Sequence, residues 1–222
     1  MRIALLGGTG DVGEGLALRW GSESAHEVVI GSRDPDDADE AADRYESTLA
    51  ERGRERKLTG FENAMAADRA DVIVLCVPPY HVADVVEGVA DNLADGDVVV
   101  TPAAGIKRDG DGFHAHAPSA GSVTALVADA APEDVPVVGA FHNLAAGRLA
   151  DLDADLEIDT LVVGDDERAK RRVMGLAEDI EGLRALDAGG IGVASEVESL
   201  TPLLINVAQN NDGLHDLGVR FR

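Results

Sequence analysis

The stretch Arg2–Gly13, RIALLGGTGDVG, decides the fold class. Arg2–Leu6 is short, apolar and followed by glycines, which predicts a buried strand that ends in a tight turn. The residues that follow fit the G-x-G-x-x-G pattern and open a helix-length segment: Gly8, Thr9, Gly10, Asp11, Val12 and Gly13. In this pattern the three glycines permit the turn, the approach of a pyrophosphate and the packing of the helix on the strand. The helix N-terminus supplies free N–H groups to the anion. A dinucleotide-binding loop is therefore favoured over a glycine-rich turn without a ligand.

Strand and helix signals alternate along the rest of the chain. Continuous β-branched runs, which are typical of strands buried on both faces, predict strands at Arg2–Leu6, Glu27–Ile30, Val72–Val77, Val98–Thr101, Val135–Phe141 and Leu161–Val163. Amphipathic segments predict helices at Gly13–Trp20, Asp37–Arg52, His81–Asn92, Ser122–Ala131 and Glu167–Glu181. This alternation predicts an α/β fold, a Rossmann-type doubly wound parallel sheet.

The chain divides into a large and a small part. We expect a dinucleotide-binding domain over residues 1–190 and a small C-terminal helical segment over 191–222, with helical spacing at Val197–Asn211. Lys107–Ser119 is polar and glycine-rich, which predicts a surface loop. Ala188–Ser195 has the composition of a linker.

Composition excludes several classes of protein. The chain has 222 residues and one cysteine, Cys76, which excludes a disulfide framework and a zinc site of several cysteines. No apolar run approaches the roughly 20 residues of a membrane span, so we expect a cytoplasmic protein. A net charge of −23 argues against nucleic-acid binding. His114 and His116 form an H-x-H pair without an evident third ligand, so no metal site is expected.

The charge is also informative in detail. The sequence has 42 acidic residues and 19 basic residues, and only Lys57, Lys107 and Lys170 are lysines. An acidic surface that is poor in lysine suits a salty cell interior, where repulsion is screened over a few Å. A halophilic source is thus favoured over an ordinary acidic protein.

The turn after the second strand indicates which dinucleotide binds. An NAD site usually has an acid at this place for the ribose hydroxyls, whereas Ser32 and Arg33 stand here. A guanidinium grips a phosphate in a bidentate manner, and the Thr9 hydroxyl is placed to reach the same group. NADP is therefore favoured over NAD. Asp34 keeps the alternative open, because its carboxylate would accept ribose hydroxyls if it turned inward.

The second substrate should lie beyond the carboxyl ends of the parallel strands. Val77, Pro78, Ala103 and Ala104 stand at two of these ends and suit a flat nicotinamide that is approached closely. His142 ends another strand, whereas His81 is better explained as the first residue of a helix. No acid–base constellation is present, although reduction of a ketone or imine usually needs a general acid. The pattern favours hydride transfer between two cofactor rings, which needs orientation more than a proton relay.

Four segments together resemble the NADPH-dependent F420 reductases, also called F420H2:NADP oxidoreductases. They are Met1–Gly13, Gly31–Arg33, Phe141–Asn143 and the run VESLTPLL at Val197–Leu204. The resemblance covers nearly the whole chain, and the ESLTPLL run is its most specific part. It implies reversible hydride transfer between NADP and the deazaflavin coenzyme F420, by a homodimer of archaea and some actinobacteria.

The resemblance also implies site residues. Thr9, Ser32 and Arg33 would hold the 2′-phosphate of NADP, and His142, Ser199 and Thr201 would line the deazaflavin pocket. Ser199 and Thr201 have a second interpretation, as the N-cap of a helix with Pro202 at its first position. Two other functions stay open: an NADP-dependent imine or hydroxy-acid reductase, which usually adds a long helical domain, and an NADP-sensing regulator without turnover.

Overall fold

An eight-stranded sheet forms the centre of the chain, and all 222 residues are described by a computed structural model. Its strands are β1 (Arg2–Leu6), β2 (Glu27–Ser32), β3 (Thr59–Glu62), β4 (Val72–Leu75), β5 (Val98–Thr101), β8 (Val137–Gly139), β9 (Ile158–Gly164) and β10 (Leu183–Gly189). Their order across the sheet is β10-β9-β8-β5-β4-β1-β2-β3. The strand order therefore reverses between β1 and β4, the kind of switch point where open α/β sheets bind ligands.

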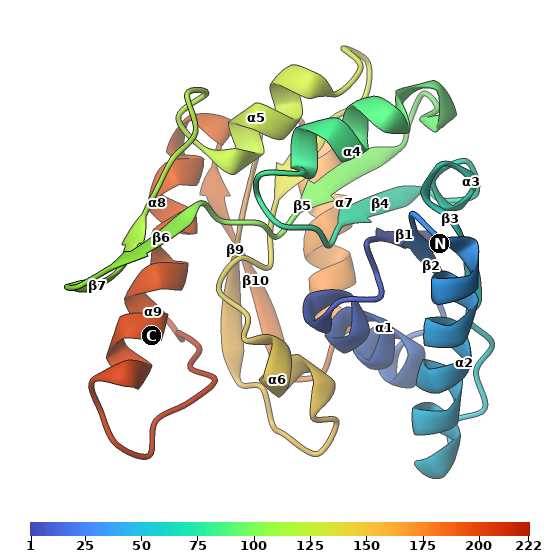
Figure 1. Cartoon of the computed structure of the whole chain (residues 1–222), viewed down its shortest axis with the longest axis horizontal. Helices are drawn as coiled ribbons and strands as arrows, with labels where there is room; N and C mark the ends of the chain where they lie inside the picture. The colour runs from blue at the N-terminus through green and yellow to red at the C-terminus, as the bar shows by residue number, and fades with distance from the viewer.

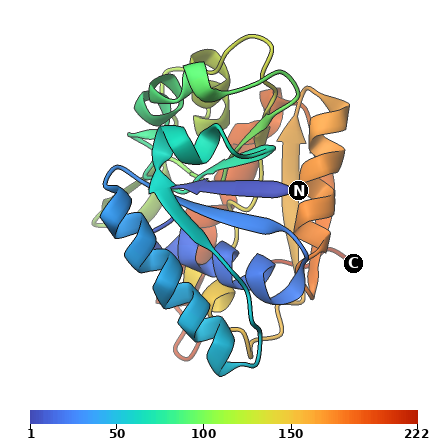
Figure 2. The same cartoon turned by 90° about the vertical axis from the view of Figure 1, so that its right-hand side faces the viewer.

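Helices cover both faces of this sheet. They are α1 (Asp11–Glu23), α2 (Pro35–Glu51), α3 (Asn63–Ala67), α4 (Val82–Gly88), α5 (Val123–Ala130), α6 (Ala146–Ala150), α7 (Glu167–Glu178), α8 (Ala194–Glu198) and α9 (Leu200–Gln209), with short 3₁₀ turns at Ala90–Asn92 and Ile191–Val193. In Figure 1, α3, α4 and α5 lie above the sheet, and α1, α2 and α6 lie below it. Figure 2 shows the same two layers on either side of the strands.

Alternate residues of each strand feed the two layers. In β1, Ile3 and Leu5 belong to the core cluster that includes α1, α2 and α7, whereas Ala4 and Leu6 belong to the cluster that includes α3, α4 and α5. Both sets are fully buried. The continuous apolar runs of the sequence are thus explained by a doubly wound sheet, which confirms the predicted fold class.

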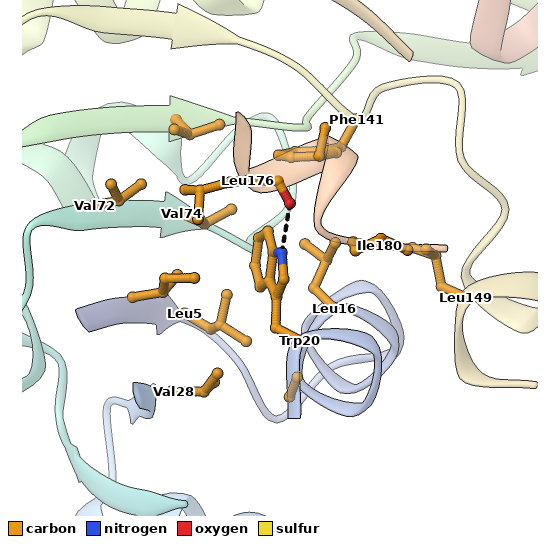
Figure 3. Close-up of a cluster of buried hydrophobic side chains, with 14 of the residues drawn as sticks. Leu5, Leu16, Trp20, Val28, Val72, Val74, Phe141, Leu149, Leu176 and Ile180 are labelled. Atoms are coloured by element: carbon orange, nitrogen blue, oxygen red, sulfur yellow. Dashed lines mark hydrogen bonds between the residues drawn. The ribbon is translucent and has the colours of Figure 1, made fainter. Parts of the chain in front are cut away.

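Trp20 of α1 lies in the middle of the core cluster that includes α1, α2 and α7 (Figure 3). Its indole N–H donates to the backbone oxygen of Leu176 in α7 at 2.8 Å, and its ring meets the edge of the Phe141 ring with centroids 5.8 Å apart. The single polar atom of this large side chain therefore has a partner, as burial requires. These contacts join α1, α7 and the end of β8 into one packed unit.

Arg19 joins the same helix α1 to α6. This buried guanidinium donates to the backbone oxygens of Leu149, Arg148, Asp151 and Ala154 at 2.6–3.1 Å and pairs with Glu23. A cation placed on the last carbonyls of a short helix satisfies acceptors that the helix leaves free. The helix that begins at the glycine loop is therefore fixed to α6.

Several predictions about the elements were wrong in detail. The sheet is not wholly parallel, because β9 runs antiparallel to β8 and β10 runs parallel to β9. The predicted surface loop Lys107–Ser119 contains part of a hairpin, β6 (Ile106–Asp109) with β7 (Gly112–Ala115). The predicted linker Ala188–Ser195 holds the end of β10, a 3₁₀ turn and the start of α8. The predicted helix Val197–Asn211 is divided at Ser199 into α8 and α9.

The C-terminal tail lies beside β9. Because β8 pairs with only Val163 and Gly164 of β9, the first half of β9 is open on that side. The backbone N–H of Asp159 donates to Val219 at 2.8 Å, and the Asp159 carboxylate accepts from the N–H of Phe221 and from Arg184. The tail thus closes the gap that the short β8 leaves.

One helical segment is apolar over a length close to that of a membrane span. Ile191–Gln209 has 19 residues and a mean hydropathy of 1.2, so by length and composition alone it passes the test for a membrane span. The expectation that no stretch approaches that length was therefore wrong. Only 22% of the tested window is buried, and it includes the buried charged residue Glu198.

Candidate functional site at the carboxyl edge of the sheet

The glycine loop leaves its anion-binding groups free. Gly10 stands at the N-cap of α1 and offers no side-chain cap, and the first helical bond runs from Glu14 N–H to the Gly10 oxygen. The N–H groups of Asp11, Val12 and Gly13 therefore have no acceptor in the helix. A Cβ on Gly10 would meet nothing closer than 3.7 Å, so the approach to these groups is open. This arrangement fits a pyrophosphate.

The glycines divide their tasks differently from the prediction. Gly7, and not Gly8, has the left-handed backbone conformation of the turn, with a φ of 71°. Gly8 is required for space instead, because a Cβ there would lie 2.6 Å from the Leu5 oxygen. A Cβ on Gly13 would lie 2.5 Å from the Cα of Gly8, which confirms that Gly13 lets the helix pack closely. The motif alone did not separate these roles.

Tyr45 of α2 fixes the loop from below. Its buried hydroxyl donates to the backbone oxygen of Gly8 at 3.0 Å, and burial raises the pKa of Tyr45 to about 12. The hydroxyl is therefore protonated, and can donate, at neutral pH. No sequence pattern predicts this contact, since Tyr45 occupies one apolar position of an amphipathic helix.

The end of β2 carries the predicted phosphate-binding pair. Ser32 is buried and its Oγ accepts from the N–H of Asp34 at 3.3 Å, whereas Arg33 is exposed and forms no ion pair. Asp34 caps α2, because its carboxylate accepts from the N–H of Asp36 at 3.0 Å. The carboxylate that kept NAD open is thus engaged in the structure, and the guanidinium is free for a phosphate.

The next two strand ends carry small apolar groups. Val77 contacts the Gly7 turn, and Pro78 follows it after β4. Ala103 and Ala104 are nearly buried after β5, where the Ala103 N–H donates to the Thr101 hydroxyl at 3.3 Å. Because β5, β4, β1 and β2 are adjacent and parallel, these residues continue the edge that begins at the glycine loop. His81, as predicted, stands at the N-cap of α4.

The end of β8 is strained at Phe141. This bulky residue has a φ of 67°, a region that such side chains rarely occupy. Its N–H donates to the Thr160 hydroxyl at 3.0 Å, and its ring is held against Trp20. The turn sends the Phe141 ring into the core and brings the next residue, His142, to the edge of the sheet.

His142 is buried and neutral. Its side chain lies against Gly139, where a Cβ would come within 3.0 Å of Cε1, and neither ring nitrogen has a hydrogen-bond partner or solvent access. Burial lowers the pKa of His142 to about 4. The imidazole is therefore uncharged at neutral pH. The two ring nitrogens are shielded from the cavity, although the resemblance implied that His142 lines the deazaflavin pocket.

A cavity of about 580 Å³ lies between α6, α9 and the C-terminal tail. His142, Thr201, Leu204, Ile205 and Leu214 are among the residues that line it. The Thr201 hydroxyl donates to the backbone oxygen of His142 at 2.8 Å, so α9 is fastened to the end of β8. The structure thus brings together two of the three residues predicted for the deazaflavin.

Ser199 does not join them. Its hydroxyl donates to the backbone oxygen of Ser195 at 2.6 Å, within its own helical segment, and Ser199 is not part of the cavity wall. The second interpretation is confirmed in one respect, because Ser199 stands at the N-cap position of α9. Its side chain makes no cap bond, however, and Pro202 is the third residue of the helix, not the first.

Asn143 also lines the cavity, although the sequence predicted no role for it beyond the segment Phe141–Asn143. Its Nδ2 donates to the backbone oxygen of Asp159 at 2.7 Å, while its buried Oδ1 has no partner. Asp159 also holds the tail, so Asn143 and the cavity wall formed by the tail are fixed to the same residue. No group of three metal-ligating side chains is present.

Comparison with known proteins assigns the family. Residues 2–105 match the family model of F420-dependent NADP oxidoreductases. The chain is 39% identical over 213 residues to the F420-dependent NADP reductase of Methanocaldococcus jannaschii, a match that spans 93% of this chain and 92% of the relative. The chain belongs to the family of F420-dependent NADP reductases. The enzyme of the same name from Methanothermobacter marburgensis is 36% identical over 230 residues, which span 100% of this chain and 98% of that one.

A solved structure extends the comparison to the fold. The crystal structure of a candidate F420-dependent NADP reductase from Arthrobacter sp. FB24 superposes with a TM-score of 0.81 at 24% identity. The match covers 100% of this chain and 99% of that one, so the similarity in fold extends over the C-terminal helices and the tail.

Proposed function

We propose that this chain catalyses reversible hydride transfer between NADP(H) and the deazaflavin coenzyme F420. The observation that carries the proposal is the continuous edge of the sheet, which runs from a free anion-binding loop at α1 to the cavity of about 580 Å³ beside His142 and Thr201. A dinucleotide bound along this edge would have its 2′-phosphate end at Arg33 and its nicotinamide end toward the cavity. The family of the chain supports the same activity.

The NADP site is assigned to three groups of residues. Gly8, Thr9, Gly10, Asp11, Val12 and Gly13 would form the pyrophosphate-binding loop, in which the free N–H groups of the last three residues would bind the anion. Thr9, Ser32 and Arg33 would hold the 2′-phosphate, for which the unpaired Arg33 guanidinium is suited. Val77, Pro78, Ala103 and Ala104 would form the flat bed of the nicotinamide ring. When bound, NADPH supplies a hydride, and these residues orient the ring and exclude water from it.

The F420 site is assigned to the cavity. Thr201 and His142 would orient the deazaflavin, with Ser199 stabilising the segment that carries Thr201 and not touching the ring. Because the His142 imidazole is neutral, it serves as a hydrogen-bonding group, after a turn of its side chain toward the cavity, and not as a proton donor. Replacement of His142 by Ala is therefore expected to weaken F420 affinity more than it slows single-turnover hydride transfer.

The remaining expectations concern assembly and setting. We assign residues 1–190 to NADP binding and 191–222 to the cover that completes the F420 site. Leu203 and Val207 are exposed on α9, and only 22% of the tested window in the apolar segment Ile191–Gln209 is buried, which supports burial in a homodimer in place of a membrane. The excess of acids supports a cytoplasmic enzyme of a halophilic archaeon without affinity for nucleic acid.

The direct test is to mix the purified protein with NADPH and oxidised F420 and to follow the deazaflavin absorbance. Bleaching that depends on both compounds is the expected result. Oxidation of NADPH by a keto acid or a cyclic imine, without any reaction with F420, would contradict the proposal. NADP binding with no turnover of any acceptor would indicate a regulator instead.

A further inference from the structure

Glu198 is a buried carboxylate that the assigned functions leave unexplained. It is 5% exposed and has no cationic partner. One oxygen accepts from the backbone N–H of Val123 at 2.9 Å, and the other accepts from the N–H and the hydroxyl of Thr124, both at 2.9 Å. A buried charge is retained only where such bonds compensate its lost hydration.

These bonds place the carboxylate on the N-terminus of α5. The free N–H groups and the dipole of the helix stabilise a negative charge there. Burial raises the pKa of Glu198, and the bonds from Val123 and Thr124 oppose this shift. α5 already has a cap, since Ser122 accepts from the N–H of Ala125 at 2.9 Å. Capping of α5 alone therefore does not account for Glu198.

The position of Glu198 in the chain shows what the bonds secure. It is the last residue of α8, directly before the break at Ser199 and three residues before Thr201. The Thr201 hydroxyl must meet the His142 oxygen at 2.8 Å, so the start of α9 has to be fixed in place. Further along, Asn206 bonds both backbone groups of Phe113 in β7. The bonds of Glu198 thus hold the segment directly before α9, and the bonds of Asn206 hold the middle of this helix.

The same turn of α5 also touches the surroundings of His142. A Cβ on Gly139 would lie 2.6 Å from the Thr124 hydroxyl and 3.0 Å from Cε1 of His142, so these two side chains are neighbours across Gly139. Thr124 therefore bonds Glu198 and also lies close to the His142 ring. The first turn of α5 thus contacts both the residue at the α8–α9 junction and the surroundings of the imidazole.

We propose that Glu198 is a positioning residue for the F420 site, which fixes the α8–α9 junction so that Thr201 and His142 form one wall of the cavity. This inference rests on the proposed function. Glu198 touches neither substrate site, since it is not part of the cavity wall. Its loss should therefore impair F420 binding without altering the glycine loop, which belongs to a distant part of the sheet edge.

The test compares Glu198→Gln with the control Glu196→Gln, an exposed residue of the same helix that bonds Ser195. A Gln keeps the shape but turns an amide N–H₂ toward donors. We expect a KM for F420 about tenfold higher in Glu198→Gln, a Kd for NADPH within twofold of the unaltered enzyme, and faster hydrogen exchange in Leu200–Gln209. An unchanged KM for F420 with unchanged exchange would overturn the proposal, as would equal losses toward both substrates.

A second pair keeps the question decidable if Glu198→Gln does not fold. Thr124→Val removes one of the three hydrogen bonds and should raise the KM for F420 about threefold, whereas Thr124→Ser, which keeps the hydroxyl, should restore it. Equal KM values in this pair would overturn the proposal. If the unaltered protein does not reduce F420, the proposed function fails, and the exchange of α9 in the variants still decides whether Glu198 positions the helix.

Discussion

The Thr201 hydroxyl and the His142 backbone oxygen are 2.8 Å apart and join two residues that are 59 positions apart in the chain. The bond links α9 to the end of β8, where the backbone of Phe141 is strained. A strained turn persists only when its surroundings hold it. The bond is therefore one of the contacts that keep the cavity wall in place.

Removal of this bond should weaken F420 binding selectively. Thr201→Val keeps the shape of the side chain and loses a hydrogen bond worth about 1 kcal/mol, so the KM for F420 should rise roughly fivefold. Steady-state kinetics with each substrate varied in turn measures the effect. Thr48→Val, which removes a hydroxyl bonded to Arg44 on the distant helix α2, serves as the control and should leave both KM values unchanged. A normal KM for F420 in Thr201→Val would contradict the assignment.

Arg33 should determine the choice of dinucleotide. A charge-assisted bond to a phosphate contributes about 1.5–3 kcal/mol, so Arg33→Ala should weaken NADPH binding roughly 10- to 100-fold and leave NADH binding unchanged. Titration of the protein with both dinucleotides measures the ratio. Arg54→Ala removes another exposed arginine and should not alter the preference. If Arg33→Ala still prefers NADPH, the 2′-phosphate site lies elsewhere.

Two glycine substitutions should have opposite effects. Gly13→Ala places a Cβ 2.5 Å from the backbone of Gly8, so it should abolish NADP binding and lower the free energy of unfolding by about 1–3 kcal/mol. Gly175→Ala, inside α7, meets no atom within 4 Å and should stabilise the protein by about 0.5–1 kcal/mol. Thermal denaturation and NADP titration test both. Retained NADP affinity in Gly13→Ala would disprove the close packing of the loop on the helix.

The burial of His142 should make the fold sensitive to acid. Its pKa is lowered to about 4, whereas an unfolded histidine titrates near 6.5. As the pH falls below 6.5, His142 binds a proton in the unfolded chain but stays neutral in the folded chain. The residue therefore lowers the free energy of unfolding progressively down to about pH 4. Between pH 7 and pH 5 its contribution is about 2 kcal/mol.

Urea denaturation at both pH values measures this effect. His142→Phe should lose less stability on acidification than the unaltered protein does, by about 2 kcal/mol. His116→Gln, at an exposed histidine, is the control and should behave as the unaltered protein. An equal acid sensitivity of all three proteins would show that His142 accepts a proton in the folded state.

Salt should stabilise the protein. With 42 acidic and 19 basic residues the folded state repels itself, and the Debye length shortens from about 10 Å at 0.1 M salt to about 3 Å at 1 M. The midpoint of thermal denaturation should therefore rise with KCl over this range. Sucrose at equal osmolality, which does not screen charge, should raise it less. A midpoint that is independent of KCl would argue against a halophilic adaptation.

The parts of the fold that follow from local patterns were predicted well. β1 and β5 have the predicted bounds, because both are short, mostly apolar runs that are followed directly by glycine or proline. The glycine pattern likewise located the loop and the start of α1. β3 and β10 were missed, since they are edge strands whose burial is incomplete and whose sequences lack such a run. The antiparallel direction of β9 relative to β8 depends on contacts between distant segments, which no local sequence pattern indicates.

The candidate site was predicted as a set of residues, not as a geometry. His142 and Thr201 meet at the cavity, but the direction of the imidazole depends on the space left by Gly139 and on the strained Phe141. Tyr45 and Glu198 were missed because a buried hydroxyl or carboxylate looks, in sequence, like an ordinary position of a helix. Their partners lie 37 and about 75 positions away, so only the folded chain identifies them.

The pairing of the tail with β9 also affects the order in which the protein folds during its synthesis. Val219 and Phe221 bond to Asp159, and the segment before them forms one wall of the cavity. These residues follow all the strands of the sheet in the chain, so they leave the ribosome later than those strands do. The Rossmann half has its strands available earlier, and domains tend to fold in the order of synthesis. The nascent chain should therefore form its glycine loop first and close the cavity only after residues 214–221 have left the ribosome.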